Sequence, residues 1–535
     1  MAMKKNNLLL ISAVSGLAVL AACSGQEEVS EDEQAVSGEE AGSEGGELLL
    51  AMPSDAVTLD PHRSNDIPSN IVSTNLYERL IETDEDMNFI PGLANSYEQI
   101  DETTWEFELQ EGVEFHDGEP FNADAVEANI DRLLNPDIAS PRAFLYDMIT
   151  EVEIIDDHTV RIHTEYPFGP LLHHLSHDGA SMISPKAIEE GYDNERNLDV
   201  EPAGTGAFTF ESWDQGNEVI LTRNENYWRE QPDLNSVTFR VIPEQLTRIG
   251  MLENNEAHVA ASIEPVNTTA VESMPNADLQ IQDGLRVDYI GFNTQSEPFD
   301  DVRVRQAITH AINTEDIITG LYEGYGMHAK GPVSPLVFGF AEGAEPLDYD
   351  VEQAKELLAE AGYEDGFQTT ITTNEENPIR NQIAALVQDR LSEIGIDVEI
   401  QSLEWGTFLD ATSEGTYDIQ LSGWTTATGD ADYGIYSLYH TDNLGSAGNT
   451  SFYENEELDT LIENARQETD ETVRQELYED ITQQLIDEAP HIYTVHEQHL
   501  TGVNESIEGL IQHPNGTFIF DEVRVLDAVE EDESY

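Results

Sequence analysis

The residues best suited to ligand recognition lie between positions 417 and 440, in the stretch YDIQLSGWTTATGDADYGIYSLYH. Apolar and polar residues alternate over its first five positions, which predicts a short buried strand. We expect a loop of small polar residues after Trp424, carrying Asp430 and Asp432 beside three tyrosines. Because loops on a rigid scaffold commonly carry function, this segment is a candidate recognition surface. The alternative is a surface turn whose tyrosines pack locally.

A histidine cluster, His173, His174 and His177, raises the question of a metal site. His173 and His177 are four residues apart, but they lie beside leucines and no third ligand is near in the sequence. We therefore favour packing or surface roles for these histidines over metal binding. Walker, dinucleotide-binding, GxSxG and HExxH motifs are absent. Acidic pairs identify no catalytic site, since 108 of 535 residues are Asp or Glu, and we expect no enzyme.

Strands and helices alternate along the chain, which favours α/β layers over a sandwich or a bundle. Helical apolar spacing and period-two alternation place these elements. The expected helices include residues 70–81, 122–134, 302–312, 350–361, 380–394, 456–465 and 471–487, and the expected strands include residues 46–52, 104–109, 236–241, 369–373 and 398–403. A chain of this length, with 39% hydrophobic residues, predicts more than one folding unit.

The charge balance is strongly acidic, with 23 Lys and Arg against 108 Asp and Glu, a net charge of −85 and a pI near 4.1. Nucleic acid is excluded as a partner, because phosphate binding needs clustered Lys and Arg. The acidic residues are spread along the chain rather than gathered in one tail. We interpret them as a surface adapted to high salt or high pH outside the cell.

The N-terminus predicts a secreted, lipid-anchored protein. Lys4 and Lys5 precede an apolar run over residues 8–20, which is typical of a secretory signal and too short to span a bilayer. Leu20-Ala21-Ala22-Cys23 resembles the bacterial lipobox, so we expect a signal peptide over residues 1–22 and acyl chains, including palmitate, on Cys23. Cys23 is the only cysteine, which leaves no disulfide. The acidic, Gly- and Ser-rich residues that follow, up to about residue 46, predict a flexible tether.

Several segments together resemble the extracytoplasmic solute-binding proteins of peptide- and nickel-type ABC importers, family 5. They include Leu76-Tyr77-Glu78-Arg79-Leu80, VEFHDGEPFNADAV over 113–126, AGTGAFTF and LTRNENY within 203–227, and the stretches 290–294, 302–308 and 349–363. They appear in family order over residues 47–525. The likeness is greatest to dipeptide-, oligopeptide- and glutathione-binding lipoproteins.

The resemblance implies a two-lobed periplasmic-binding-protein type II fold that closes on its ligand by a hinge, with an extra subdomain in the first lobe. We place lobe one at residues 47–288 plus 505–535, with the inserted subdomain at about 82–200, and lobe two at residues 289–504. The crossings would fall near 284–290 and 496–502. We expect a monomer that captures small peptides and delivers them to a membrane permease without a cofactor.

Site residues carry over from the family only in part. Trp405 matches a pocket tryptophan of dipeptide-type members. The aspartate that holds a dipeptide ammonium there corresponds to Ala427, and the arginine that grips the carboxylate corresponds to Asn374. Either Asp430 or Asp432, with Arg380, replaces these anchors, or the ligand is not a simple dipeptide. The expected ligand-binding residues are Trp405, Asp430, Asp432, Trp424, Thr425, Tyr433, Arg380, Asn374, Asn65 and Asp66.

The sequence leaves two ligand classes open. The loop sequence from Thr426 to Tyr433 resembles members that bind glutathione or other small peptides. A nickel or metal-chelate binder has the same fold, with His440 or His496 as the candidate ligands. We favour the peptide, because an ordinary structural role is more common for such histidines.

Overall fold

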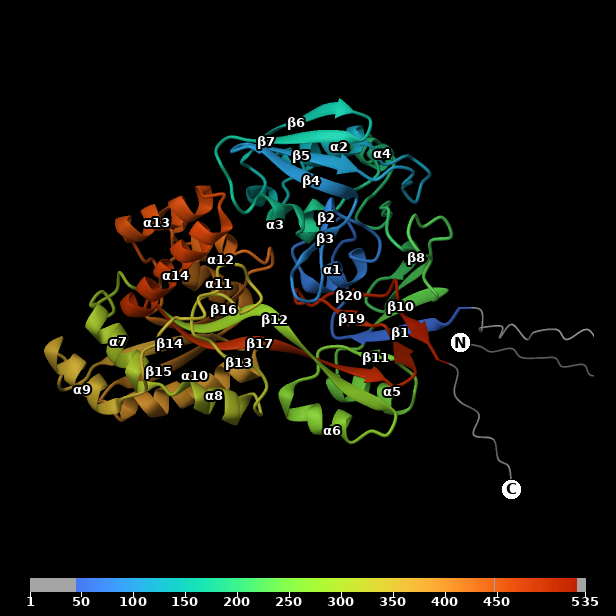
Figure 1. The fold of residues 1–535 in the computed structure, drawn as a ribbon. Helices are drawn as coiled ribbons and strands as arrows, with labels where there is room; N and C mark the ends of the chain where they lie inside the picture. Colours follow the sequence, from blue (N-terminus) through green and yellow to red (C-terminus); the bar gives the residue numbers. More distant parts are fainter. Residues whose placement is uncertain (1–44, 447, 527–535) are drawn as a thin grey trace, which may run out of the picture. The chain divides into compact units, whose positions relative to one another are not determined.

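The computed structural model describes residues 45–446 and 448–526, and every structural statement below concerns these residues. The expected signal peptide (1–22), Cys23, most of the tether (23–46) and the last residues of lobe one (527–535) lie outside them. Strands and helices alternate through the described part (Figure 1), which confirms the α/β prediction. No helix described is long and apolar enough to cross a bilayer.

One large mixed sheet connects most of the described chain. Its strands are β1 (Glu47–Met52), β8 (Phe208–Asp214), β9 (Glu218–Arg223), β10 (Ser236–Val241), β11 (Val259–Ala260), β12 (Ala277–Phe292), β13 (Met327–His328), β14 (Gln368–Asn374), β15 (Asp397–Leu403), β16 (Ile419–Thr425) and β17 (His491–Asn504). They pair in the order β15-β14-β16-β12-β17-β11-β1-β10-β9-β8, and β13 pairs with β17.

The long strands β12 and β17 belong to both ends of this sheet (Figure 1). Residues 277–283 of β12 pair with β17 next to β11, and residues 287–291 pair with it next to β16; the register shifts between these two parts. The expected crossings at 284–290 and 496–502 lie on these two strands. We call β1 and β8–β11 with their helices the first lobe, and β13–β16 with theirs the second lobe.

The first lobe carries an inserted subdomain with a sheet of its own, in the order β4-β5-β7-β6. Its hydrophobic core lies between this sheet and a long helix, and includes Phe107, Phe121, Val126, Ile130 and Leu133. The elements are β4 (Ala94–Asp101), β5 (Thr104–Leu109), β6 (Ile149–Asp156), β7 (Thr159–Thr164), α2 (Ala123–Leu134), α3 (Leu171–Leu175) and α4 (Pro185–Tyr192). Two short strands, β2 (Ile81–Thr83) and β3 (Phe89–Pro91), form the hairpin that precedes β4.

The helix expected over residues 70–81 is wrong at both ends, because α1 covers Ile67–Ser73. Asp66 caps its start with a side-chain hydrogen bond to Ser69 N, and Pro68 fits the first turn. At the other end the Asn75 side chain donates to the Ile71 carbonyl and to the Phe518 carbonyl, at 3.1 and 2.9 Å. The buried apolar residues that follow lie in a turn and a strand instead.

The remaining helices include those expected over residues 302–312, 350–361, 380–394, 456–465 and 471–487, each within a few residues of its predicted bounds, and others that were not predicted, among them the helix over Ala431–Tyr439. They are α5 (Gln245–Glu253), α6 (Thr268–Glu272), α7 (Val302–Ala311), α8 (Thr314–Leu321), α9 (Val351–Glu360), α10 (Pro378–Ser392), α11 (Trp405–Ser413), α12 (Ala431–Tyr439), α13 (Glu456–Gln467) and α14 (Glu471–Glu488). Short strands β18 (Ile507–Glu508) to β21 (Arg524–Val525) include the hairpin β19 (Ile511–Gln512) and β20 (Phe518–Ile519), which packs on the first lobe.

Candidate ligand-binding site

The recognition stretch forms β16 and α12, so the loop predicted after Trp424 is shorter than expected. Asp430 caps α12, and its side chain accepts a hydrogen bond from the backbone N–H of Asp432 at 2.9 Å. The three tyrosines fall within the helix at a spacing of three residues. Asp430 directly before a repeat of tyrosines three residues apart indicates the start of a helix, and the loop prediction missed this signal.

Asp430 is fully buried and already has a cationic partner. Both of its carboxylate oxygens accept a hydrogen bond from Nη2 of Arg474, at 2.9 Å each, and Nε2 of His173 lies 3.7 Å away. Burial alone would raise the pKa of Asp430, but Arg474, His173 and the Asp432 N–H together outweigh burial, so the pKa lies below its usual value. Asp430 therefore holds the start of α12 against α14.

Asp432 is also buried, but its partners are poorer. Its Oδ1 atom accepts no hydrogen bond from the described residues. Nε of Arg466 lies 3.4 Å from Oδ1, and Nε2 of His174 lies 3.7 Å from Oδ2. Burial raises the pKa of Asp432, while the Arg466 charge opposes that rise. Asp432 therefore keeps acceptor capacity for another donor.

Asp432 lines a cavity of about 500 Å³ between the inserted subdomain and the second lobe. The subdomain contributes Phe144, Leu145, Asp147, Tyr166 and His174, and the second lobe contributes Asp432, Tyr433, Tyr436, Ser437, Asn443, Ser446 and Arg466. Aromatic walls with a few charged groups are typical of small-ligand pockets. The Arg466 guanidinium lies 3.9 Å above the Tyr436 ring, which orients it within the cavity.

Arg142 connects this cavity to both lobes. Its Nη1 donates to the Tyr433 hydroxyl at 3.1 Å, and its Nη2 donates to the Asn65 carbonyl at 3.4 Å. The Tyr433 ring in turn packs against Trp424, with the ring centroids 5.3 Å apart. Three predicted residues, Asn65, Trp424 and Tyr433, are thus joined through an arginine that the sequence analysis did not single out.

Arg380 lies in a second charged group, at the β12–β16 pair. Asp288 accepts from Nη2 of Arg380 at 3.2 Å, from Nη2 of Arg286 at 3.0 Å and from the Tyr322 hydroxyl at 3.0 Å. Burial would raise the pKa of Asp288, but the two arginines outweigh it and the pKa is lowered. Arg286 is the strand partner of Thr425, so one of these two arginines lies beside this predicted residue.

A cavity of about 290 Å³ adjoins this group and is lined by both lobes and by β17. Ile67 and Ile71 of α1 line it from the first lobe, and Tyr322 and Ile379 line it from the second. Ile379 directly precedes Arg380 in α10. The predicted anchor Arg380 therefore lies next to an opening between the lobes, with its guanidinium already paired.

The other predicted residues lie apart from these groups or act as caps. Trp405 begins α11, is 43% exposed and stacks on Phe408 at 5.6 Å. Asn374 ends β14, and its side chain accepts from the backbone N–H of Glu376 at 2.9 Å. Asp66 caps α1 and also accepts from the Ser69 hydroxyl at 2.9 Å. Among the described residues, no hydrogen bond or ion pair joins Trp405 or Asn374 to Asp432.

The histidines have structural partners within the described chain. His174 Nδ1 contacts the Leu145 carbonyl at 2.6 Å, and His177 Nδ1 accepts from Gly179 N at 3.0 Å. His440 Nδ1 accepts from the Asp442 N–H at 3.1 Å, whereas buried His496 has no hydrogen-bond partner there. Burial lowers the pKa of His496 to about 3. No group of three His, Cys, Asp or Glu side chains suited to a metal occurs among the described residues.

The functional residues that sequence reasoning missed are mainly arginines: Arg142, Arg286, Arg466 and Arg474. A signal for them exists in the composition. Only 23 residues of the chain are Lys or Arg, so a buried arginine is far more informative here than any acidic residue. Arg142, Arg466 and Arg474 each pair with a predicted site residue from another segment, and Arg286 pairs with Asp288, which also binds the predicted residue Arg380.

Comparison with known proteins places this geometry in a family. The model of the bacterial extracellular solute-binding proteins, family 5 Middle, matches residues 88–446. The glutathione-binding protein GsiB of Pectobacterium atrosepticum is 33% identical over 484 residues, covering 89% of this chain and 93% of that protein.

Two solved structures have the same fold. HbpA2 of Haemophilus parasuis superimposes with a TM-score of 0.81 at 28% identity, covering 90% of this chain and 100% of that one. The periplasmic binding protein DppA of Helicobacter pylori, in complex with the peptide STSA, gives 0.77 at 28% identity, with 90% and 98% covered. The predicted family and two-lobed binding-protein fold are confirmed. The chain belongs to the bacterial extracellular solute-binding proteins of family 5.

Proposed function

We propose that this protein is the solute-binding component of an ABC importer, and that it captures small peptides, including glutathione, by closure of its two lobes. The observation that carries this proposal is the cavity beside α12, where Asp432 retains acceptor capacity, Arg466 lines the wall, and Arg142 donates to the Tyr433 hydroxyl of the same wall. The likeness to GsiB and to the peptide complex of DppA supports the same ligand class. The protein would bind and release its ligand without chemical change.

Within this site, Asp432 would receive the ligand ammonium, and Arg142 and Arg466 would receive carboxylates. Charge-assisted hydrogen bonds of this kind are about twice as strong as neutral ones. Glutathione carries one ammonium and two carboxylates, which matches this set of charges. Arg380, beside Asp288, would serve a longer ligand that extends toward the hinge strands. Asp430 would hold α12 in place. The other residues that we propose to contact the ligand are aromatic or polar: Trp405, Trp424, Tyr433, Thr425, Asn374, Asn65 and Asp66.

The alternative ligand, nickel or a metal chelate, has less support. Its candidate ligands His440 and His496 lie on α12's C-terminal cap and on β17, and neither belongs to a metal-suited group among the described residues. His440 has Glu463 3.4 Å from Nε2 and Asp442 3.9 Å from Nδ1, which are carboxylates at the two different ring nitrogens rather than a converging ligand set. We therefore favour a peptide over nickel or a metal chelate as the ligand.

We further propose that Cys23 is lipidated and that the protein is a monomer held at the outer face of the cytoplasmic membrane, where it serves a permease. The boundaries that we keep are residues 47–288 plus 505–535 and residues 289–504, with the insertion at about 82–200. The acidic surface would keep the protein soluble at high salt or high pH.

Titration calorimetry with dipeptides, longer peptides, glutathione and Ni²⁺ tests the ligand class, together with mass spectrometry of whatever co-purifies. Micromolar or tighter binding of a peptide, weakened at least tenfold by Asp432→Asn, is the expected result. Tight binding of Ni²⁺ alone would overturn the peptide proposal. Sustained cleavage of a bound peptide would overturn the proposal that the protein only binds.

A further inference from the structure

The segment 168–174 of the inserted subdomain contacts the second lobe directly, through protein groups alone. The backbone N–H of Gly169 donates to the Arg466 carbonyl at 3.1 Å. The Phe168 ring lies 5.3 Å from the Arg466 guanidinium. These contacts join the turn before α3 to the end of α13 (Figure 1).

Two consecutive histidines of this segment face two carboxylates of the second lobe. His173 lies opposite Asp430 and His174 opposite Asp432, with Nε2 to Oδ2 distances of 3.7 Å in both cases. His173 also packs between two rings, Phe89 of the subdomain side at 4.5 Å and Phe338 of the second lobe at 6.0 Å. The neighbouring histidines therefore match the two acids at the start of α12 one to one.

The inserted subdomain side and the second lobe each insert one side chain into the hydrophobic core of the other. Met87, in the turn between β2 and β3, is 8% exposed and packs in the core of the second lobe, whereas Tyr433 of α12 packs in the core of the inserted subdomain. Met87 has φ of 64°, an uncommon backbone conformation for a residue with a side chain. A Cβ at Gly429 would lie 2.4 Å from Met87 Cε, so the second lobe leaves room for this methionine.

Gly169 makes the closest approach. A Cβ there would lie 2.2 Å from the Glu468 carbonyl oxygen and 2.7 Å from Cδ and Nε of Arg474. All three atoms belong to the second lobe. A larger residue at this position would therefore strain the contact between the two sides while meeting none of the nearest atoms of its own subdomain.

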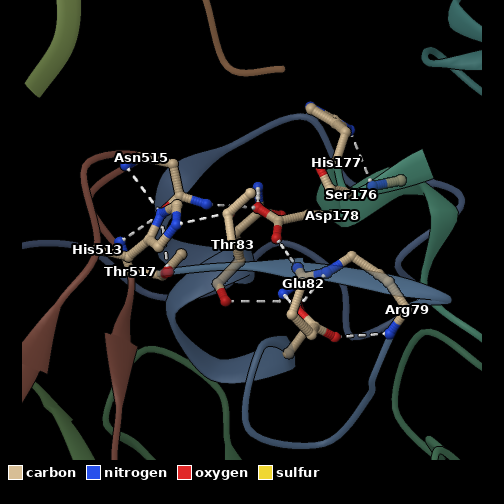
Figure 2. Close-up of polar contacts among 12 residues, drawn as sticks. Arg79, Glu82, Thr83, Ser176, His177, Asp178, His513, Asn515 and Thr517 are labelled. Carbon is tan, nitrogen blue, oxygen red and sulfur yellow. Dashed lines mark hydrogen bonds and ion pairs between the residues drawn. The ribbon is translucent and has the colours of Figure 1, made fainter. Parts of the chain in front are cut away.

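Behind α3 the segment is fastened to the first lobe (Figure 2). Asp178 pairs with Arg79, and its Oδ2 accepts from Asn70 at 3.0 Å and from Asn515 at 3.3 Å. These partners come from α1 and from the hairpin near the C-terminus. These bonds therefore fix the end of α3 to the first lobe, so α3 and the first lobe would move together.

We propose that residues 168–174, together with Met87, form a latch that holds the two lobes in the closed form by direct contacts between protein groups, at the edge of the proposed ligand cavity. The latch would slow ligand release, because it must open before the lobes separate. The inference rests on the proposed closure of the lobes but on no particular ligand. Contacts of this kind change dissociation rates more than association rates.

Hydrogen–deuterium exchange of the full chain, with no peptide added, tests the latch through the amide of residue 169, which bonds across the lobes. We expect this amide to be protected, and Gly169→Ala to speed its exchange, corrected for the intrinsic rate, by about tenfold or more. The amide of Glu165, which donates to Met148 within the subdomain at 2.9 Å, should keep its rate. Gly191→Ala is the matched control, because its Cβ would meet only Leu198, at 3.6 Å.

Exchange at position 169 as fast as that of an unstructured amide, or unchanged in Gly169→Ala, would overturn the latch. If Gly169→Ala also exposes Glu165, His173→Ala decides: faster exchange at 169 with Glu165 protected supports the latch, and any other pattern overturns it. Because no ligand is present, a chain that shows this pattern yet binds no peptide would overturn the proposed function and leave the latch standing.

Discussion

Arg142 donates hydrogen bonds in two directions, from Nη1 to the Tyr433 hydroxyl at 3.1 Å and from Nη2 to the Asn65 carbonyl at 3.4 Å. One side chain of the inserted subdomain thus contacts the first lobe and the second lobe together. Since the three residues are far apart in sequence, the contact exists only when the segments are assembled around the cavity beside α12. A ligand carboxylate bound by Arg142 would therefore affect both the first lobe, through Asn65, and the second lobe, through Tyr433.

Tyr433→Phe tests this arrangement with minimal disturbance. The change removes the hydroxyl that accepts from Arg142 but keeps the ring that packs on Trp424. We expect peptide affinity to fall about tenfold, because a hydrogen bond to a charged group contributes about 1.5 kcal/mol or more. Calorimetry measures the effect, and Tyr192→Phe, at a half-exposed side chain of α4, is the control. Equal losses in both variants would contradict the role given to Tyr433.

Asp430→Asn should act mainly on stability. The substitution leaves the Arg474 guanidinium, whose side chain is only 3% exposed, without its carboxylate. Breaking a buried ion pair in this way costs about 3–5 kcal/mol. Chemical denaturation monitored by circular dichroism measures the loss. An unfolding free energy within about 1 kcal/mol of the unmodified protein would show that the pair contributes little.

Asp432→Asn should act mainly on binding. This carboxylate has an oxygen without a hydrogen bond among the described residues, so its removal breaks no strong internal partner. We expect the unfolding free energy to change by less than that of Asp430→Asn, while peptide affinity falls at least tenfold. The same two measurements applied to both variants separate an anchor from a structural acid. If Asp432→Asn instead lost more stability and Asp430→Asn lost more peptide affinity, the ligand ammonium would be assigned to Asp430.

The sequence predicted the elements far better than it predicted the charges of the site. Regular spacing was sufficient for α2, α7 and α9, whose apolar faces follow a single period. The end of α1 depends on Asn75 bonding to Phe518, more than 400 residues away. Such a contact has no local signature, and the helix prediction over 70–81 extended too far at its C-terminal end for that reason.

The site shows the same limit. Asp430 and Asp432 were chosen together because both lie in the expected loop of small polar residues, beside three tyrosines. The difference between them comes from Arg474 and Arg466, on two helices further along the chain, and only the first of these donates hydrogen bonds to its acid. Residue type and spacing therefore identified the segment, and tertiary pairing distinguishes the two carboxylates.

Trp405→Ala tests a residue whose family match and surroundings differ. The ring is 43% exposed and stacks only on Phe408 among the aromatic residues described. If Trp405 closes onto the ligand, affinity should fall about tenfold or more with little change in stability, since aromatic anchors dominate binding energies. Leu409→Ala, at 45% exposure on the same helix, is the matched control. Unchanged affinity in Trp405→Ala would remove this residue from the site.

Glu78 makes the stability of the first lobe depend on pH. Its carboxylate is 7% exposed and accepts from the Tyr227 hydroxyl at 3.0 Å and from Trp228 Nε1 at 2.8 Å. Burial raises its pKa from 4.5 to about 7, although Arg229 and Trp228 oppose the rise. Between these two values the folded chain holds a proton that the unfolded chain has released, so this group's contribution to stability falls as pH rises through that window.

Glu78→Gln should therefore remove a pH-dependent loss of about 3 kcal/mol between roughly pH 4.5 and pH 7. The measurement is the unfolding free energy of variant and unmodified protein across that range, and the informative quantity is the difference between the two curves. That difference should grow in favour of Glu78→Gln as pH rises and level off above about 7. Glu85→Gln, at an exposed position nearby, should give parallel curves. Parallel curves for Glu78→Gln as well would mean that this carboxyl titrates in the folded protein as it does in the unfolded chain.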